Sequence, residues 1–217
     1  EDFTTMAISS ALLAAEAYAV AVLLLGFFQT AESIERTPEP LPDDPALWPT
    51  VDIFVPSYNE PVQVILPTLI GCKAIDYPNK KIYLLDDGNR EEMRELAAKL
   101  DIGYLTRDNN EHAKAGNINA ALKQTDGEFV AVFDADHIPT RAFLQLTMGF
   151  FANARVALVQ TPHHFFNADP FERNLQVYGT VPGEQNLFYH QIQPASDFWN
   201  AVYFCGSCAV IRRTALE

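Results

Sequence analysis

The chain opens with one long apolar stretch. Residues 6–28 are almost unbroken apolar sequence, and Glu16 is the only charged residue among them. About 20 such residues are enough for a helix to cross a bilayer. A secretory signal peptide fits poorly, because no basic residue precedes the stretch and it is too long. We therefore predict a transmembrane helix with its flank over residues 1–36.

The charges around this stretch bear on its orientation. Arg36 follows it, whereas only Glu1 and Asp2 precede it. Positive charge favours the cytoplasmic side, so we expect the chain after the helix to be cytoplasmic. Residues 37–49 are rich in proline, which predicts an extended linker between the helix and the remainder of the chain.

From residue 50 onward, short apolar runs alternate with amphipathic segments. The runs are β-branched and apolar, as in buried strands, and the segments between them have helical spacing. The expected strands are 51–56, 81–85, 102–106, 129–133 and 156–160, with one or two more within 201–211. The expected helices are 62–74, 90–100, 116–124, 139–151 and 170–191. This alternation predicts one α/β domain over 50–217, built on a mostly parallel sheet.

Composition limits the partners. The 217 residues carry a formal net charge of −13, and 48% of them are hydrophobic, enough for a sizeable core. The acidic balance argues against nucleic acid, whose phosphates require clustered Lys and Arg. A nucleotide ligand remains compatible, because a divalent cation held by carboxylates can meet its phosphates. The three cysteines include a Cys205-x-x-Cys208 pair, which we interpret as two small apolar residues in a buried strand.

Polar residues follow three of the expected strands. The segments are Pro56-Ser-Tyr-Asn-Glu60, Asp86-Asp87-Gly88 and Asp134-Ala-Asp136. Ligands of open α/β sheets bind at the carboxyl ends of strands, and carboxylates gathered there require a cation. Capping of the following helices is the alternative, but it explains three acidic strand ends poorly. We predict a nucleotide site with Mg²⁺ held by oxygen ligands.

A second motif adds positive charge. Lys114 and Gly116 lie beside an expected helix start, where an ammonium and backbone N–H groups can meet a phosphate. Because this loop lies between two acidic strand ends, we predict that it contacts a diphosphate.

At these residues the sequence resembles the bacterial cellulose synthase catalytic subunits, which are processive family 2 glycosyltransferases. The resemblance covers nearly the whole chain. The motifs that carry it are Val55-Pro-Ser-Tyr-Asn-Glu-Pro61, Asp86-Asp-Gly88, His112-Ala-Lys-Ala-Gly-Asn117, Phe133-Asp-Ala-Asp-His137, Gln160-Thr-Pro-His163 and Phe204-Cys-Gly-Ser207. It implies a GT-A fold, UDP-glucose as donor, Mg²⁺ or Mn²⁺ as cofactor and a β-1,4-glucan as product.

The resemblance also implies roles for single residues. Ser57, Tyr58 and Glu60 would lie at the uracil, and Asp86 or Asp87 would hold the uridine. Asp134 and Asp136 would bind the metal and diphosphate, with Lys114 on the phosphates. The residues implied near the acceptor glucan are Gln160, Thr161, Pro162, His163, Phe204, Cys205, Gly206 and Ser207.

The family's Thr-Glu-Asp motif, which carries the catalytic base, is expected beyond residue 217, so we expect nucleotide binding without polymerisation from these residues alone. The resemblance further implies a multi-pass protein of the bacterial inner membrane, a periplasmic partner subunit and control by cyclic-di-GMP through regions outside this sequence.

Three alternatives remain. Another processive synthase could make hyaluronan, chitin, a mixed-linkage glucan or a mannan, because short motifs encode sugar identity poorly. A non-catalytic scaffold with a transferase fold is a second, although no recognised metal or nucleotide residue is missing. A transporter would rest on the single apolar stretch alone.

Overall fold

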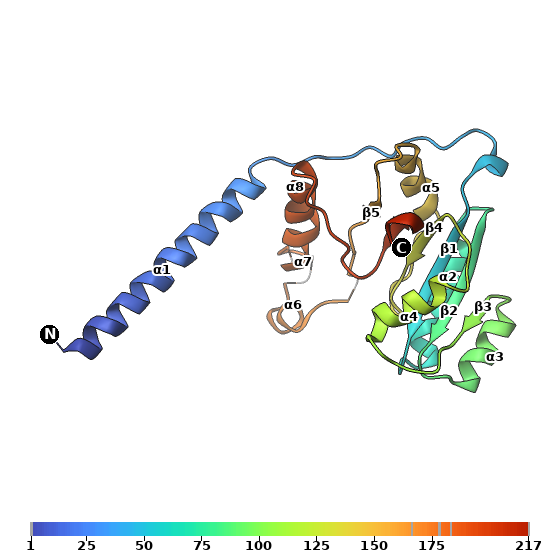
Figure 1. Ribbon diagram of the computed structural model, residues 1–217, viewed down its shortest axis with the longest axis horizontal. Helices are drawn as coiled ribbons and strands as arrows, with labels where there is room; N and C mark the ends of the chain where they lie inside the picture. Colours follow the sequence, from blue (N-terminus) through green and yellow to red (C-terminus); the bar gives the residue numbers. More distant parts are fainter. Residues whose placement is uncertain (1, 166, 178, 183, 217) are drawn as a thin grey trace. The chain divides into compact units, whose positions relative to one another are not determined.

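The computed structural model describes residues 2–165, 167–177, 179–182 and 184–216. The chain forms two compact units, one of residues 1–36 with 162–202 and one of 37–161 with 203–217 (Figure 1). These two units do not coincide with the domain boundaries that we expected after residues 36 and 49. Those boundaries stay a prediction.

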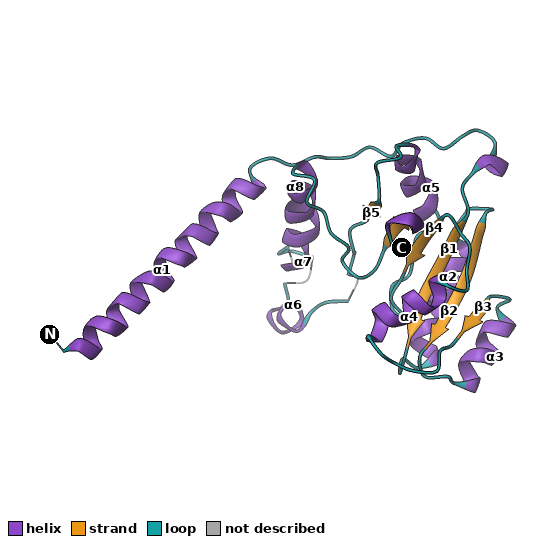
Figure 2. Ribbon diagram, viewed as in Figure 1, coloured by secondary structure: helices purple, strands orange, loops and turns teal. Residues whose placement is uncertain are grey.

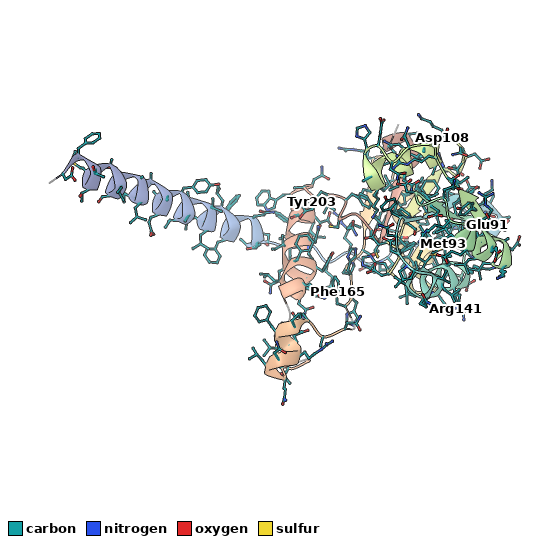
Figure 3. All side chains as sticks on the ribbon, turned by 90° about the horizontal axis from the view of Figure 1, so that it is seen from below. Glu91, Met93, Asp108, Arg141, Phe165 and Tyr203 are labelled. Atoms are coloured by element: carbon teal, nitrogen blue, oxygen red, sulfur yellow. The ribbon has the colours of Figure 1, made fainter. Side chains whose placement is uncertain are left out.

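The first unit begins with helix α1, Phe3–Thr30. The Asp2 side chain caps it by accepting a hydrogen bond from the backbone N–H of Thr4 (3.2 Å). All residues of α1 are exposed, and their side chains extend on all sides of the helix (Figure 3). Its length and apolar composition suffice to cross a membrane.

The rest of the first unit corrects one prediction. A continuous helix over 170–191 is wrong. The structure has α6 (Pro170–Leu175), α7 (Glu184–Leu187), a π-helical turn (Phe188–Ile192) and α8 (Gln193–Phe198). The break follows from the backbone, because Gln176 and Gly179 have left-handed φ values of 55° and 74°. An ion pair between Arg36 and Asp197 ties the end of the N-terminal segment to α8.

The second unit contains a six-stranded sheet of order β3-β2-β1-β4-β6-β5 (Figure 2). Strands β1 to β4 are parallel, and β6 runs antiparallel to both β4 and β5. The bounds are β1 Val51–Ser57, β2 Lys80–Asp86, β3 Gly103–Leu105, β4 Phe129–Val132, β5 Leu158–Gln160 and β6 Ala209–Arg212. The α/β class with a mostly parallel sheet is therefore confirmed.

Helices cover both faces of this sheet. The helices are α2 (Val62–Ala74), α3 (Glu91–Lys99), α4 (Ala113–Leu122) and α5 (Phe143–Thr147), the last followed by the 3₁₀ turn η2 (Met148–Ala152). Side chains of β1 alternate between two cores. Ile53 and Val55 pack with α2, α3 and α5, whereas Phe54 packs with α4. Met93 of α3 lies inside the body, while Glu91 points outward (Figure 3).

Two helices differ from expectation. Helix α4 begins at Ala113, three residues before the predicted start, after His112 in a left-handed conformation (φ 60°). The helix predicted over 139–151 is a short α-helix that continues as a 3₁₀ turn. The last segment forms one strand, β6, in agreement with the one or two strands expected there, and it runs antiparallel to β4.

The proline-rich segment 37–49 is part of the second unit and packs against the rest of it. It contains a 3₁₀ turn, η1 (Pro45–Leu47), and a Trp48 ring whose centroid lies 5.1 Å from that of Tyr77. The Trp48 indole N–H donates to the Pro42 carbonyl (2.8 Å). At Gly149 the two backbones are so close that a Cβ would collide with the Glu39 carbonyl oxygen. The segment is thus extended but held along the body over much of its length.

Candidate functional site

The pocket lies at the point where the chain switches sides of the sheet. After β1 the chain continues to β2 on one side, and β4 pairs with β1 on the other, so a crevice opens between the ends of β1 and β4. An open pocket of ≈ 490 Å³ occupies this position. Its lining residues are Pro56, Ser57, Tyr58, Glu60, Val64, Asp87, Asn110, Ala113, Lys114, Asn117, Asp134, Ala135 and Asp136.

The turn after β1 is held by one carboxylate. Glu60 Oε2 accepts hydrogen bonds from the Tyr58 backbone N–H (2.8 Å) and the Ser57 hydroxyl (3.0 Å). Burial alone would raise the pKa of Glu60, but these hydrogen bonds and the nearby Arg90 outweigh it and lower the pKa. The ionised Glu60 therefore fixes the turn and leaves the Tyr58 ring half exposed at the pocket.

Asp86, at the end of β2, is fully buried and lies outside the pocket lining. Its carboxylate accepts hydrogen bonds from the Arg90 guanidinium (2.9 and 3.1 Å) and the Tyr104 hydroxyl (2.9 Å). Arg90 also donates to the Ser57 hydroxyl and the Glu60 carbonyl (both 2.6 Å). The Asp86–Arg90 pair thus joins the ends of β1 and β2 into one rigid support.

Its neighbour Asp87 does line the pocket. Arg107 binds both oxygens of Asp87, through Nε (2.6 Å) and Nη2 (2.7 Å), in a bidentate ion pair. Both side chains are nearly buried, with exposed fractions of 6% for Asp87 and 9% for Arg107. Of the two adjacent aspartates, only Asp87 therefore lines the pocket.

The acidic pair after β4 also lines the pocket. Asp134 and Asp136 are partly exposed there, and the Lys114 ammonium, from the first turn of α4, forms an ion pair with Asp134. Lys114 also donates to the Gly206 carbonyl. Two carboxylates beside open volume form a set of oxygen donors that suits a hard divalent cation, and a cationic group already lies against one of them. The residues present fit such an ion.

The loop before β6 supports this acidic pair. The buried hydroxyl of Ser207 accepts a hydrogen bond from the Asp134 backbone N–H (2.8 Å) and lies 2.7 Å from His137 Nδ1. The position of Asp134 thus depends on a segment more than seventy residues away in the sequence.

The predicted acceptor-side residues separate into two groups. Gln160 at the end of β5 binds the 205–208 loop, accepting from the Cys205 N–H (2.9 Å) and donating to the Ser207 carbonyl (2.9 Å). The Thr161 hydroxyl donates to the Cys208 carbonyl (2.8 Å). Phe204 and Gly206 lie in the same loop. Pro162 and His163 belong to the first unit, where His163 Nδ1 lies 2.7 Å from the Tyr189 hydroxyl.

The prediction that Cys205 and Cys208 lie in a buried strand is wrong. Cys205 and Cys208 lie in the loop before β6, which begins at Ala209, and Cys208 has a left-handed backbone (φ 54°). None of the three cysteines, all of which the structure describes, forms a disulfide bond. Burial raises the pKa of Cys208 to about 11, so its thiol stays protonated at neutral pH.

Sequence reasoning missed the residues that hold the carboxylates. The pattern of hydrophobic and polar positions places Arg90 in an ordinary charged helix and does not single out Arg107. Arg107 follows β3, so the rule that singled out the other strand ends would have included it. Asn117, buried in α4, donates to the Leu85 carbonyl (3.0 Å), and the sequence indicates it only as part of a motif.

Comparisons with known proteins identify the family of the chain. The family model described as glycosyl transferase family 2 matches residues 52–217. The cellulose synthase catalytic subunit (UDP-forming) of Xanthomonas axonopodis pv. citri is 57% identical over 209 residues, and that of Pseudomonas fluorescens is 50% identical over 219. The matches cover 95% and 100% of this chain, but only 29% and 30% of the relatives. The resemblance to bacterial cellulose synthase catalytic subunits is confirmed.

Solved structures support the fold. The mannosyltransferase PcManGT from Pyrobaculum calidifontis, in complex with GDP-Man and Mn²⁺, has a TM-score of 0.61 at 22% identity, over 94% of this chain and 56% of that one. S. aureus TarS 1-349, in complex with UDP-GlcNAc, has a TM-score of 0.53 at 17% identity, over 77% and 46%. With the mostly parallel sheet and the matched domain, these likenesses confirm the GT-A class. The chain belongs to glycosyl transferase family 2.

Proposed function

We propose that this chain supplies the donor site of an inverting, processive transferase that moves glucose from UDP-glucose to the non-reducing end of a β-1,4-glucan. One observation carries the proposal. The turn after β1, Asp87, Lys114 and the acidic pair all line one pocket at the switch point of the sheet. The high identity to cellulose synthases favours glucose as the sugar.

The nucleoside end of the donor would lie at the β1 and β2 ends. The half-exposed Tyr58 ring offers an aromatic face for uracil, on a turn that Glu60 keeps fixed. Asp87 would present its carboxylate to the nucleoside, held in place by the bidentate ion pair with Arg107. In this account Asp86 supports the site without touching the ligand.

The diphosphate end would lie at β4 and α4. Asp134 and Asp136 would hold a divalent cation, Mg²⁺ or Mn²⁺, which would neutralise the charge of the departing diphosphate. Lys114 would move from Asp134 to a phosphate oxygen, since its ammonium already lies at the pocket wall. Positive charge at this position would stabilise the departing diphosphate.

The acceptor glucan would approach the 204–207 loop and the end of β5, which Gln160 joins by hydrogen bonds. A carboxylate base would take the proton of the acceptor's 4-hydroxyl as that oxygen attacks the anomeric carbon and UDP leaves. We assign this base to no described residue of the chain. The cellulose synthases that match this chain are more than three times as long as the matched region.

Helix α1 supports a proposal for the location of the protein. Helix α1 would span the bacterial inner membrane, with the transferase body on the cytoplasmic side where nucleotide sugars are made. A lipid bilayer and the growing glucan would then be direct partners. Binding of a periplasmic subunit and of cyclic-di-GMP is proposed for other regions of the whole protein.

Donor choice is tested by competition. The chain would be purified in detergent, loaded with a fluorescent UDP analogue and Mn²⁺, and titrated with UDP-glucose, UDP-N-acetylglucosamine and GDP-mannose. We expect UDP-glucose to displace the analogue at the lowest concentration. Preference for UDP-N-acetylglucosamine would favour a chitin or hyaluronan synthase, and preference for GDP-mannose would favour a mannan synthase.

A further inference from the structure

Arg107 holds two separate parts of the pocket at once. Its Nε and Nη2 bind the carboxylate of Asp87, at the end of β2. Its Nη1 donates to the Glu111 carbonyl (2.6 Å), and Nη2 donates also to the Ala113 carbonyl (2.9 Å). These two carbonyls stand on either side of the start of α4, so one side chain connects the strand end to the helix that carries Lys114.

The backbone between these carbonyls needs such support. His112 and Ala113 both have left-handed φ values, 60° and 45°. Non-glycine residues rarely adopt this conformation, and two in succession are less common still. Hydrogen bonds from a fixed guanidinium on both sides of the turn hold it in place. The turn determines where α4 begins, and therefore where Lys114, one residue later, meets the pocket.

Arg107 has little capacity left for a ligand. A guanidinium has five N–H donors. One is used at Nε, one at Nη1 and two at Nη2, so four of the five are engaged within the protein. Arg107 is also absent from the pocket lining. It acts through Asp87 and Lys114 and does not contact the ligand itself.

Space around the guanidinium is closed as well. A Cβ at Gly116, in the first turns of α4, would collide with the Glu111 carbonyl oxygen and with Arg107 Nη1. The helix can approach the guanidinium this closely because position 116 has no side chain. A lysine at 107 could place one ammonium near Asp87, but it has no planar fork to reach both carbonyls.

We propose that Arg107 is a positioning residue that sets the spacing between Asp87, at the nucleoside end of the donor pocket, and Lys114, at its diphosphate end. The inference rests on the proposed donor site. Loss of the guanidinium would leave both groups in the chain but at the wrong separation for a nucleoside diphosphate.

The test compares a diphosphate ligand with a nucleoside. UDP with Mn²⁺ and uridine alone would be titrated into the detergent-purified chain and into its Arg107→Gln, Arg107→Lys and Lys114→Gln variants. Arg107→Gln should weaken UDP binding by roughly 10-fold, which is the order of effect expected for the loss of a hydrogen bond to a charged group. Arg107→Lys should weaken UDP binding more than uridine binding. Arg155→Gln, which removes an exposed arginine outside the pocket, is the matched control and should change neither.

A double variant separates positioning from general weakening of the fold. If Arg107 acts through Lys114, then Lys114→Gln should cost at most about 2-fold in UDP affinity in the Arg107→Gln background, because coupled residues are not additive. The inference would be overturned if the losses in UDP affinity from the two substitutions multiply in the double variant. It would also be overturned if both Arg107 variants bind UDP with wild-type affinity. If circular dichroism shows that Arg107→Gln does not fold, Arg107→Lys takes its place in the double variant with Lys114→Gln. Failure of the wild-type chain to bind UDP would instead contradict the proposed donor site.

Discussion

The Ser207 hydroxyl accepts a hydrogen bond from the backbone N–H of Asp134 (2.8 Å). Ser207 is fully buried in the loop before β6, and Asp134 begins the acidic pair after β4. The antiparallel strand β6 therefore does more than complete the sheet, because its preceding loop fixes the backbone of a proposed metal ligand.

Replacing Ser207 by alanine would leave that N–H without its partner. A backbone N–H that loses its hydrogen-bond acceptor destabilises the folded state. Ser207→Ala should therefore lower the free energy of unfolding by about 1–3 kcal/mol. Chemical denaturation followed by circular dichroism measures the change. Ser33→Ala removes an exposed hydroxyl and should have no effect. Equal stability of the two variants would contradict the role given to Ser207.

Lys114 and a metal ion compete for Asp134 in the proposed account. The ammonium lies against this carboxylate in the structure, so Lys114→Gln should tighten the binding of Mn²⁺ alone. The same change should weaken UDP binding in the presence of Mn²⁺, because a charged contact to phosphate is lost, by roughly 10-fold.

Calorimetry with each ligand, on this variant and on Lys99→Gln, tests both parts. Lys99 is an exposed residue of α3 paired with Glu95, so its removal serves as the control. Weaker Mn²⁺ binding in Lys114→Gln would show that Lys114 does not compete with the metal.

Glu60 should make the β1 turn sensitive to acid. Its pKa is lowered in the folded chain, so its carboxylate stabilises the fold fully above the ordinary glutamate pKa of about 4.3. That contribution is lost as the pH falls through the lower folded value. Glu60→Gln cannot ionise, so the difference in unfolding free energy between wild type and variant should be constant above about pH 5.5 and change only below it. A difference that changes between pH 6 and 8 would point to another group.

The contact between Gly149 and Glu39 predicts a fixed connector. Gly149→Ala would place a methyl group against the Glu39 carbonyl oxygen and displace part of the segment 37–49. Hydrogen exchange should then accelerate in this segment and in η2. At Gly26 a Cβ meets nothing within 4 Å, so Gly26→Ala is the control and should leave exchange there unchanged. Identical exchange in both variants would mean that the segment is not held at this point.

Much of the fold follows from local pattern. Strand β1 and helix α2 lie where β-branched runs and apolar periodicity predict them, because burial on both sheet faces leaves continuous apolar sequence. The start of helix α4 differs from the prediction because its first turn depends on left-handed residues held by Arg107, a contact that periodicity cannot reveal. The interruption after α6 depends likewise on Gln176, whose left-handed conformation no propensity indicates.

The sequence likewise predicts some residues of the candidate site and leaves others open. The strand-end rule located Asp134 and Asp87, because parallel strands place their carboxyl ends at one edge. It could not tell that Asp86 is buried and Asp87 faces the pocket, since adjacent side chains on a strand point to opposite sides and packing decides which is inside. The contribution of Ser207 comes from an antiparallel pairing across most of the domain, which the sequence leaves open.

The central claim is that this pocket binds a nucleoside diphosphate together with a divalent cation. The most direct measurement is calorimetric titration of UDP into the detergent-purified chain, with and without Mn²⁺, alongside an Asp134→Ala, Asp136→Ala variant whose fold is checked by circular dichroism. The account predicts binding that requires the metal and is lost in the folded variant. A folded wild-type chain that ignores UDP in both conditions, or a variant that binds it equally well, would contradict the account.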